Sequence, residues 1–191
     1  MGDTNCTNFH QFPHSLGQRG IRVKFVQFVS NFFSMEITIV LATVVALAML
    51  ARRQPAQNVF AITVLAIVIS SAIELFALRT AIPFNSILSR NMPSEKILAG
   101  LDWPIPLLWL ALLLHARALG KLVLLPCRTH SLYGIFLLGW TSVISAIGFS
   151  ILEAFYMGGF HLPNFVGRFA TAAFILVALT PWLIEKKPTT A

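Results

Sequence analysis

The sequence has few charged residues and few cysteines. Only 11% of its 191 residues are charged whereas 57% are hydrophobic, a balance that excludes an ordinary soluble domain. Its two cysteines, Cys6 and Cys127, lie far apart and form no CxxC pattern, so neither a zinc site, a redox pair nor a disulfide framework is indicated. Basic residues outnumber acidic ones, 14 to 7, but they are scattered among apolar runs, which argues against a nucleic-acid partner. The composition is typical of a small integral membrane protein with one domain.

Apolar runs predict an all-α, polytopic fold with about five membrane-spanning helices. Each run is roughly 20 residues long, the length that crosses the hydrocarbon core of a bilayer. The predicted spans cover about 33–51, 58–78, 102–119, 132–156 and 163–183. Together they form one predicted transmembrane domain (19–187), between a polar N-terminal tail (1–18) and a short C-terminal tail (188–191).

Three further segments are interpreted as lying at the membrane surface. Residues 19–33 combine apolar side chains at helical spacing with three basic residues, which predicts an interfacial amphipathic helix. Residues 85–101 form a polar connector, and residues 120–126 are too short to cross, so we interpret them as a continuation of the third span. Once Arg79 and Arg168 are set aside as intramembrane, the remaining Lys and Arg favour the C-terminal side, so we expect a cytoplasmic C-terminus.

The rare acidic residues gather toward one membrane surface. Because successive spans alternate in direction, the starts of the odd spans share a surface with the ends of the even spans. The polar residues placed there are Glu36, Glu74, Arg79, Asp102, Glu153, Asn164 and Arg168. A charge at that depth is costly unless it is paired, hydrated or functional. The gathering therefore indicates either acid chemistry on a lipid-soluble substrate or simple hydrogen bonds and salt bridges between helices.

Spacing along the fifth span places an amide, a guanidinium and a hydroxyl on one stripe. Asn164, Arg168 and Thr171 lie at i, i+4 and i+7, which are neighbouring positions on one helix face. Arg168 is the natural partner for a carboxylate on another span. We therefore expect Arg168 to pair with one of the acids.

Neither a metal nor another cofactor is expected. His115 and His161 lie near opposite surfaces in this topology, so they are not expected to share a metal. Trp103 and Trp109 could line a pocket for a flat polyene, although aromatic residues in membrane proteins more often anchor the bilayer or fill the core. The partners expected are membrane lipid and a hydrophobic polyene or isoprenoid ligand.

Three stretches of the chain follow one another in a recognisable order. They are Glu74-Leu75 with Arg79-Thr80 and Pro83-Phe84, then GLDWPIPLLW at 100–109, then LPNFVG at 162–167. These stretches resemble the family of integral-membrane carotenoid-biosynthesis proteins that includes the bacterial and archaeal carotenoid hydratases, over roughly residues 67–176. The sequence departs from the family pattern at Asn85-Ser86-Ile87, where the family has glycine and tyrosine, at Glu153-Ala154, where it has Asp-Pro, and at Arg168, where it has tryptophan.

The resemblance implies hydration of the terminal carbon–carbon double bond of an acyclic carotenoid. Such a reaction needs a protonated carboxylic acid, and burial in an apolar environment favours the protonated form. The roles that we expect are Glu74 as the acid, Glu153 or Asp102 as a second carboxylate, and as positioning groups Arg79, Asn164, Arg168, Trp103 and Trp109. The competing interpretation is a non-catalytic membrane subunit that binds pigment or lipid within a larger complex. The short chain, the altered motif positions and the basic opposite surface favour that alternative.

Overall fold

The computed structural model describes residues 35–85, 96–98, 100–157 and 159–183, and shows an all-α, multi-pass membrane fold. Its main helices are α2 (Met35–Ala51), α3 (Ala56–Thr80), α5 (Pro104–Val123), α6 (Tyr133–Met157) and α7 (Leu162–Leu183). Four of them, α3, α5, α6 and α7, are long and apolar enough to cross a membrane, whereas α2 is apolar but has 17 residues, at the lower limit of that length. The predicted helix at 19–33 and both predicted tails lie outside the described residues.

The helix boundaries follow local chemistry. α3 begins directly after Pro55, and it ends at Ala81, whose left-handed conformation (φ 58°) lets its N–H donate to the carbonyl of Ala77 at 2.8 Å. Pro104 and Pro106 occupy the first turn of α5, where an N–H has no helical partner to lose. α5 continues to Val123 and is followed by the 3₁₀ turn η1 (Leu125–Cys127), so residues 120–123 extend the third span as expected.

A small hairpin stands where the sequence predicts only a polar connector. Strands β1 (Lys96–Leu98) and β2 (Leu101–Asp102) pair antiparallel, with Lys96 opposite Asp102. Gly100, with φ 94°, lies in the turn between them, and this backbone conformation suits glycine because glycine has no Cβ. Strands of two and three residues are too short to show the alternation that reveals a strand in a sequence.

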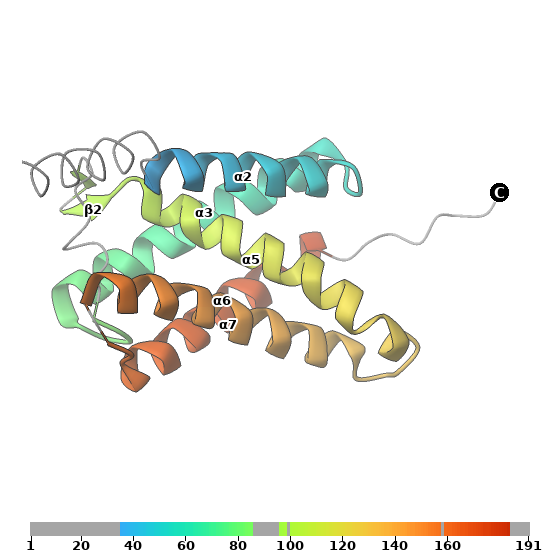
Figure 1. Cartoon of the computed structure of the whole chain (residues 1–191). Helices are drawn as coiled ribbons and strands as arrows, with labels where there is room; N and C mark the ends of the chain where they lie inside the picture. The colour runs from blue at the N-terminus through green and yellow to red at the C-terminus, as the bar shows by residue number, and fades with distance from the viewer. Residues whose placement is uncertain (1–34, 86–95, 99, 158, 184–191) are drawn as a thin grey trace, which may run out of the picture.

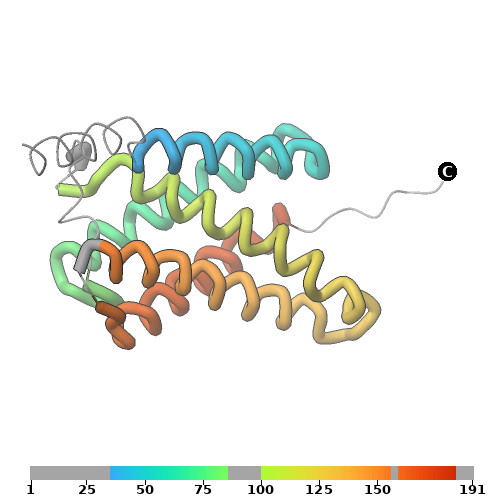
Figure 2. The backbone as a smooth tube through the Cα atoms, viewed as in Figure 1, coloured from blue at the N-terminus to red at the C-terminus, as the bar shows by residue number. Residues whose placement is uncertain are grey.

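The helices pack around α5. This helix contacts α2, α3 and α6, while α7 packs against α3 and α6. Figures 1 and 2 show that α2, α5 and α7 begin, and α3 and α6 end, at the same end of the bundle as β2. Large apolar side chains on the outer faces, such as Phe60 and Phe155, are exposed, as expected for helices that face lipid. The predicted alternation of direction therefore brings the acid-bearing helix ends together.

Candidate functional site

The candidate site is a buried cluster of side chains from four helices at that common end. Glu74 comes from α3, Trp109 from α5, Glu153 from α6, and Asn164 and Arg168 from the first two turns of α7. Glu74, Trp109 and Arg168 are fully buried, and the other two are at most 5% exposed. Uncompensated charges are rarely buried so deeply, so the contacts within the cluster decide whether it is stable.

Arg168 joins the two glutamates. Its Nη1 donates a hydrogen bond to Oε1 of Glu74. Its Nε and Nη2 both donate to Oε1 of Glu153, at 3.1 and 2.9 Å. One planar guanidinium thus links α3 to α6 through α7, a geometry that a lysine could not reproduce because its ammonium is a single point donor. The expected pairing of Arg168 with an acid is present, and it involves two acids rather than one.

Two neutral donors also bind the carboxylates. Trp109 donates its indole N–H to Oε1 of Glu74 at 3.0 Å. Asn164 donates to Oε2 of Glu153 at 3.2 Å, one turn before Arg168 on α7. The same amide also binds the backbone of Asn85, accepting its N–H at 3.0 Å and donating to its carbonyl at 3.2 Å. Asn164 therefore ties the segment after α3 to the cluster.

Aromatic rings enclose the guanidinium. The Arg168 Cζ atom lies 3.7 Å from the ring centre of Phe84, 4.5 Å from that of Phe149 and 5.5 Å from that of Trp109. The rings of Trp109 and Phe149 are themselves in contact, with centres 4.2 Å apart. These rings exclude water from the ion pairs and attract the cation through their π faces. Our sequence interpretation missed Phe84 and Phe149 as site residues. The available signal was the position of Phe149, one turn before Glu153 on the same helix face.

Gly167 allows the segment after α3 to reach the cluster. A Cβ atom at this position would overlap the carbonyl oxygen of Pro83, lie 2.7 Å from its carbonyl carbon and lie 3.0 Å from Cβ of Phe84. Only a residue without a side chain lets the two backbones approach this closely. This contact holds Phe84 over Arg168.

The cluster combines charged groups with an apolar setting. Charged groups in a low-dielectric interior are costly unless they are paired and hydrogen-bonded, and Arg168 pairs with both carboxylates. Two intramembrane acids held side by side with different hydrogen-bond donors form an arrangement that can support acid catalysis.

A family model described as carotenoid biosynthesis protein matches residues 34–191, which is most of the chain and includes every residue of the cluster. The chain belongs to this family. It is therefore a multi-pass membrane protein of carotenoid biosynthesis, and the expected family membership is confirmed. Searches of the curated proteins and of the solved structures find no match.

Four other residues that the sequence placed at this end of the carotenoid biosynthesis protein take no part in the hydrogen bonds of the cluster described above. Arg79 is exposed in the last turn of α3, because it follows Glu74 by five residues and so points about 140° away around the helix. Asp102 is fully buried in β2, and Trp103 is half-buried directly before α5. Glu36 is half-buried in the first turn of α2. Arg79 thus points away from the groups that Arg168 brings together.

Two buried hydroxyls stand one turn further into the bundle than the ion pairs. Ser150 precedes Glu153 by three residues on α6, and Thr171 follows Arg168 by three residues on the antiparallel α7, so both lie at a similar depth. Neither hydroxyl oxygen has a hydrogen-bond partner among the described residues. Buried polar atoms usually bind protein groups or water, so either hydroxyl is a candidate partner for a water molecule. No group of three or more His, Cys, Asp or Glu that could hold a metal ion occurs within the described part of the chain.

Proposed function

We propose that this protein adds water across the terminal carbon–carbon double bond of an acyclic carotenoid by acid catalysis. The observation that supports this most strongly is the pairing of two buried glutamates, Glu74 and Glu153, through the single guanidinium of Arg168. Hydration of an unactivated alkene needs a strong proton donor in a dry site, together with a fixed negative charge nearby.

Glu74 is the proposed proton donor and Glu153 the ionised partner. Glu153 accepts bonds on both oxygens, two from Arg168 and one from Asn164, which stabilises its charged form. Trp109 and Arg168 both donate to Oε1 of Glu74. The different donors around the two carboxylates support the proposal that the two acids have different roles.

The reaction transfers one proton and returns it. Glu74 gives its proton to the less substituted carbon of the terminal double bond, whose π electrons form the new C–H bond and leave a tertiary cation on the neighbouring carbon. A water oxygen then bonds to that cation, and one of the water protons passes back to the Glu74 carboxylate. Nothing is oxidised or reduced. The rings of Trp109 and Phe149, which lie against the Arg168 guanidinium, are the groups proposed to stabilise the cation through their π faces.

The hydroxyls of Ser150 and Thr171 are the proposed partners of the reacting water. Both hydroxyls are buried without hydrogen-bond partners among the described residues, and each stands one helical turn from a member of the ion-paired cluster. A water held there would be close to the proposed site of cation formation while remaining separate from bulk solvent. The position of this water relative to the acids, and not their acidity alone, decides how efficiently it captures the cation.

Access to the acids requires a side chain to move. In the conformation described, Glu74 and Arg168 are fully buried and Phe84 covers the guanidinium at 3.7 Å. Phe84 lies on the segment after α3 and not within a helix, so its displacement would uncover the cluster without breaking a helix. The carotenoid would enter from the bilayer, which its hydrocarbon chain occupies before binding.

The full burial of the cluster also favours a second function. A fully paired and enclosed ion network is also what a purely structural contact between helices looks like. On this alternative the protein is a non-catalytic subunit that binds pigment or lipid. It would then hold a carotenoid without changing it.

An assay with lycopene separates the two functions. Membranes containing the protein are incubated with lycopene, and products are analysed for the gain of one water. We expect a hydroxylated product from the native protein and a loss of about 100-fold or more in its rate for Glu74→Gln, since general acid catalysis commonly contributes that much. Glu36→Gln is the matched control, because Glu36 is a half-buried acid at the same end of the bundle.

Two outcomes would contradict hydration. In the first, membranes with folded native protein yield no product; in the second, Glu74→Gln forms the product at the native rate. Recovery of unmodified lycopene with the purified native protein, and equally with Glu74→Gln, would instead support the binding subunit. Recovery of neither product nor pigment would exclude both functions for this substrate.

A further inference from the structure

The other end of the bundle contains a cavity with a different chemistry. The cavity has a volume of about 630 Å³ and lies between the end of α2, the second half of α5, the start of α6 and the end of α7. Among the described residues that line it, Arg53, Arg117, Lys121 and Arg128 are basic and none is acidic. The described acids, Glu36, Glu74, Asp102 and Glu153, belong to the opposite end.

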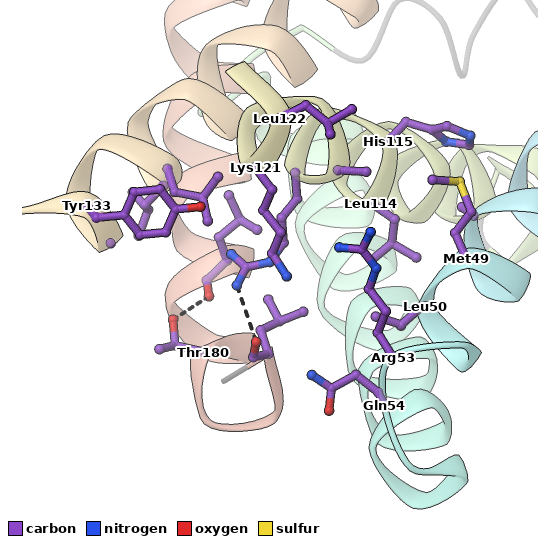
Figure 3. Close-up of a pocket in the computed structure, with 18 of the residues that line it drawn as sticks. Met49, Leu50, Arg53, Gln54, Leu114, His115, Lys121, Leu122, Tyr133 and Thr180 are labelled. Atoms are coloured by element: carbon purple, nitrogen blue, oxygen red, sulfur yellow. Dashed lines mark hydrogen bonds between the residues drawn. The ribbon is translucent and has the colours of Figure 1, made fainter. Parts of the chain in front are cut away.

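The cavity wall is amphiphilic. Beside the cations it presents an apolar surface formed by Leu50, Leu114, Leu122, Leu137 and Leu176, among others. Figure 3 shows Arg53, Lys121 and Tyr133 pointing into the same space from the turn after α2, from α5 and from α6. Arg117 donates to the carbonyl of Leu183 at 3.3 Å, which holds the end of α7 against α5. Arg53 and Arg128 are exposed at the rim.

This combination does not suit an unsubstituted carotenoid. A hydrocarbon offers no negative charge, so four cationic side chains would contribute nothing to its binding. A molecule with an anionic head and an apolar chain satisfies both parts of the wall. The cavity also lies where the ends of helices meet the membrane surface, and Leu122 on α5 is 68% exposed toward the surroundings of the bundle.

We propose that this cavity binds an anionic glycerophospholipid of the surrounding membrane. Its phosphate would lie at the cationic rim formed by Arg53 and Arg128, and the upper part of an acyl chain would lie against the leucines of α5 and α6. Basic pockets between the ends of transmembrane helices are established binding positions for anionic lipid headgroups. The volume lies within the range that such ligand sites usually have. This site is separate from the acid cluster and does not depend on the proposed hydration.

Native mass spectrometry of the full-length protein in mild detergent tests the proposal. The protein is titrated with phosphatidylglycerol and, separately, with phosphatidylcholine of the same acyl chains. We expect saturable binding of one phosphatidylglycerol with higher affinity than phosphatidylcholine. Arg53→Gln and Arg128→Gln should each lower the affinity for phosphatidylglycerol about fivefold, and together roughly 25-fold.

Arg52→Gln is the matched control. Arg52 is adjacent in sequence, exposed and equally charged, but it does not line the cavity, so its replacement should change affinity by less than about twofold. Size-exclusion elution and helical content show whether each variant is folded, and the exposed positions of all three arginines make loss of fold unexpected.

Three results would overturn the proposal. Equal affinity for the two lipids would show that the cations do not select a charge. Equal losses in Arg52→Gln and Arg53→Gln would show general attraction to the membrane surface and no defined site. Displacement of phosphatidylglycerol by a lower concentration of geranylgeranyl diphosphate, through the same arginines, would assign the cavity to an isoprenoid diphosphate instead.

Discussion

Replacing Arg168 with methionine tests whether one guanidinium holds the acid cluster together. The substitution keeps an unbranched, space-filling side chain but removes three N–H groups, of which two donate to Glu153 and one donates to Glu74. It also removes the cation that Phe84 and Phe149 cover. Breaking a buried ion pair by removing one partner typically costs about 3–5 kcal/mol. In a protein of this size that corresponds to a decrease in Tm of roughly 6–20 °C.

Thermal unfolding in detergent, followed by tryptophan fluorescence and by loss of the monodisperse elution peak, measures this change. Arg79→Met is the control, because Arg79 is exposed at the same end of the bundle and should change stability by no more than about 0.5 kcal/mol. The double variant Arg168→Met with Glu153→Leu should be more stable than Arg168→Met alone, because one unpaired carboxylate has been removed. The reasoning is wrong if Arg168→Met unfolds with the control, or if the double variant is the less stable of the two.

Two further substitutions test the surroundings of the cluster. Trp109→Phe keeps an aromatic ring but removes the N–H that donates to Glu74. We therefore expect the free energy of unfolding to fall by about 1.5–3 kcal/mol and hydration to become slower. If neither value changes, the indole N–H is dispensable. Gly167→Ala should destabilise the protein because the added Cβ would overlap Pro83. Gly139→Ala, at a position on α6 with open space around it, is the control and should be neutral or stabilising by up to about 1 kcal/mol. Equal Tm values for the two variants would contradict the close approach of the Gly167 and Pro83 backbones.

Proximity along the chain was a poor guide to the composition of the site, and proximity along a helix face was a better one. The sequence analysis placed Arg79 and Glu74 toward the same membrane surface, near the end of one span, yet the structure leaves Arg79 exposed and fully buries Glu74. Asn164 and Arg168, four residues apart, do contact the same acid. The difference follows from the 3.6-residue helical period, which aligns residues four apart and separates residues five apart by about 140°.

The sequence by itself determined the membrane class, the helical spans and the family, because apolar runs of a certain length have few alternatives in a bilayer. Alternation of direction then followed from connectivity, and with it the separation of acids from the basic end. Only the tertiary structure decided that Arg168 joins Glu74 to Glu153, that Trp109 binds Glu74, and that Phe84 covers the guanidinium. These contacts depend on how each helix is rotated about its axis and on a glycine contact between backbones, and both are fixed by packing between distant segments.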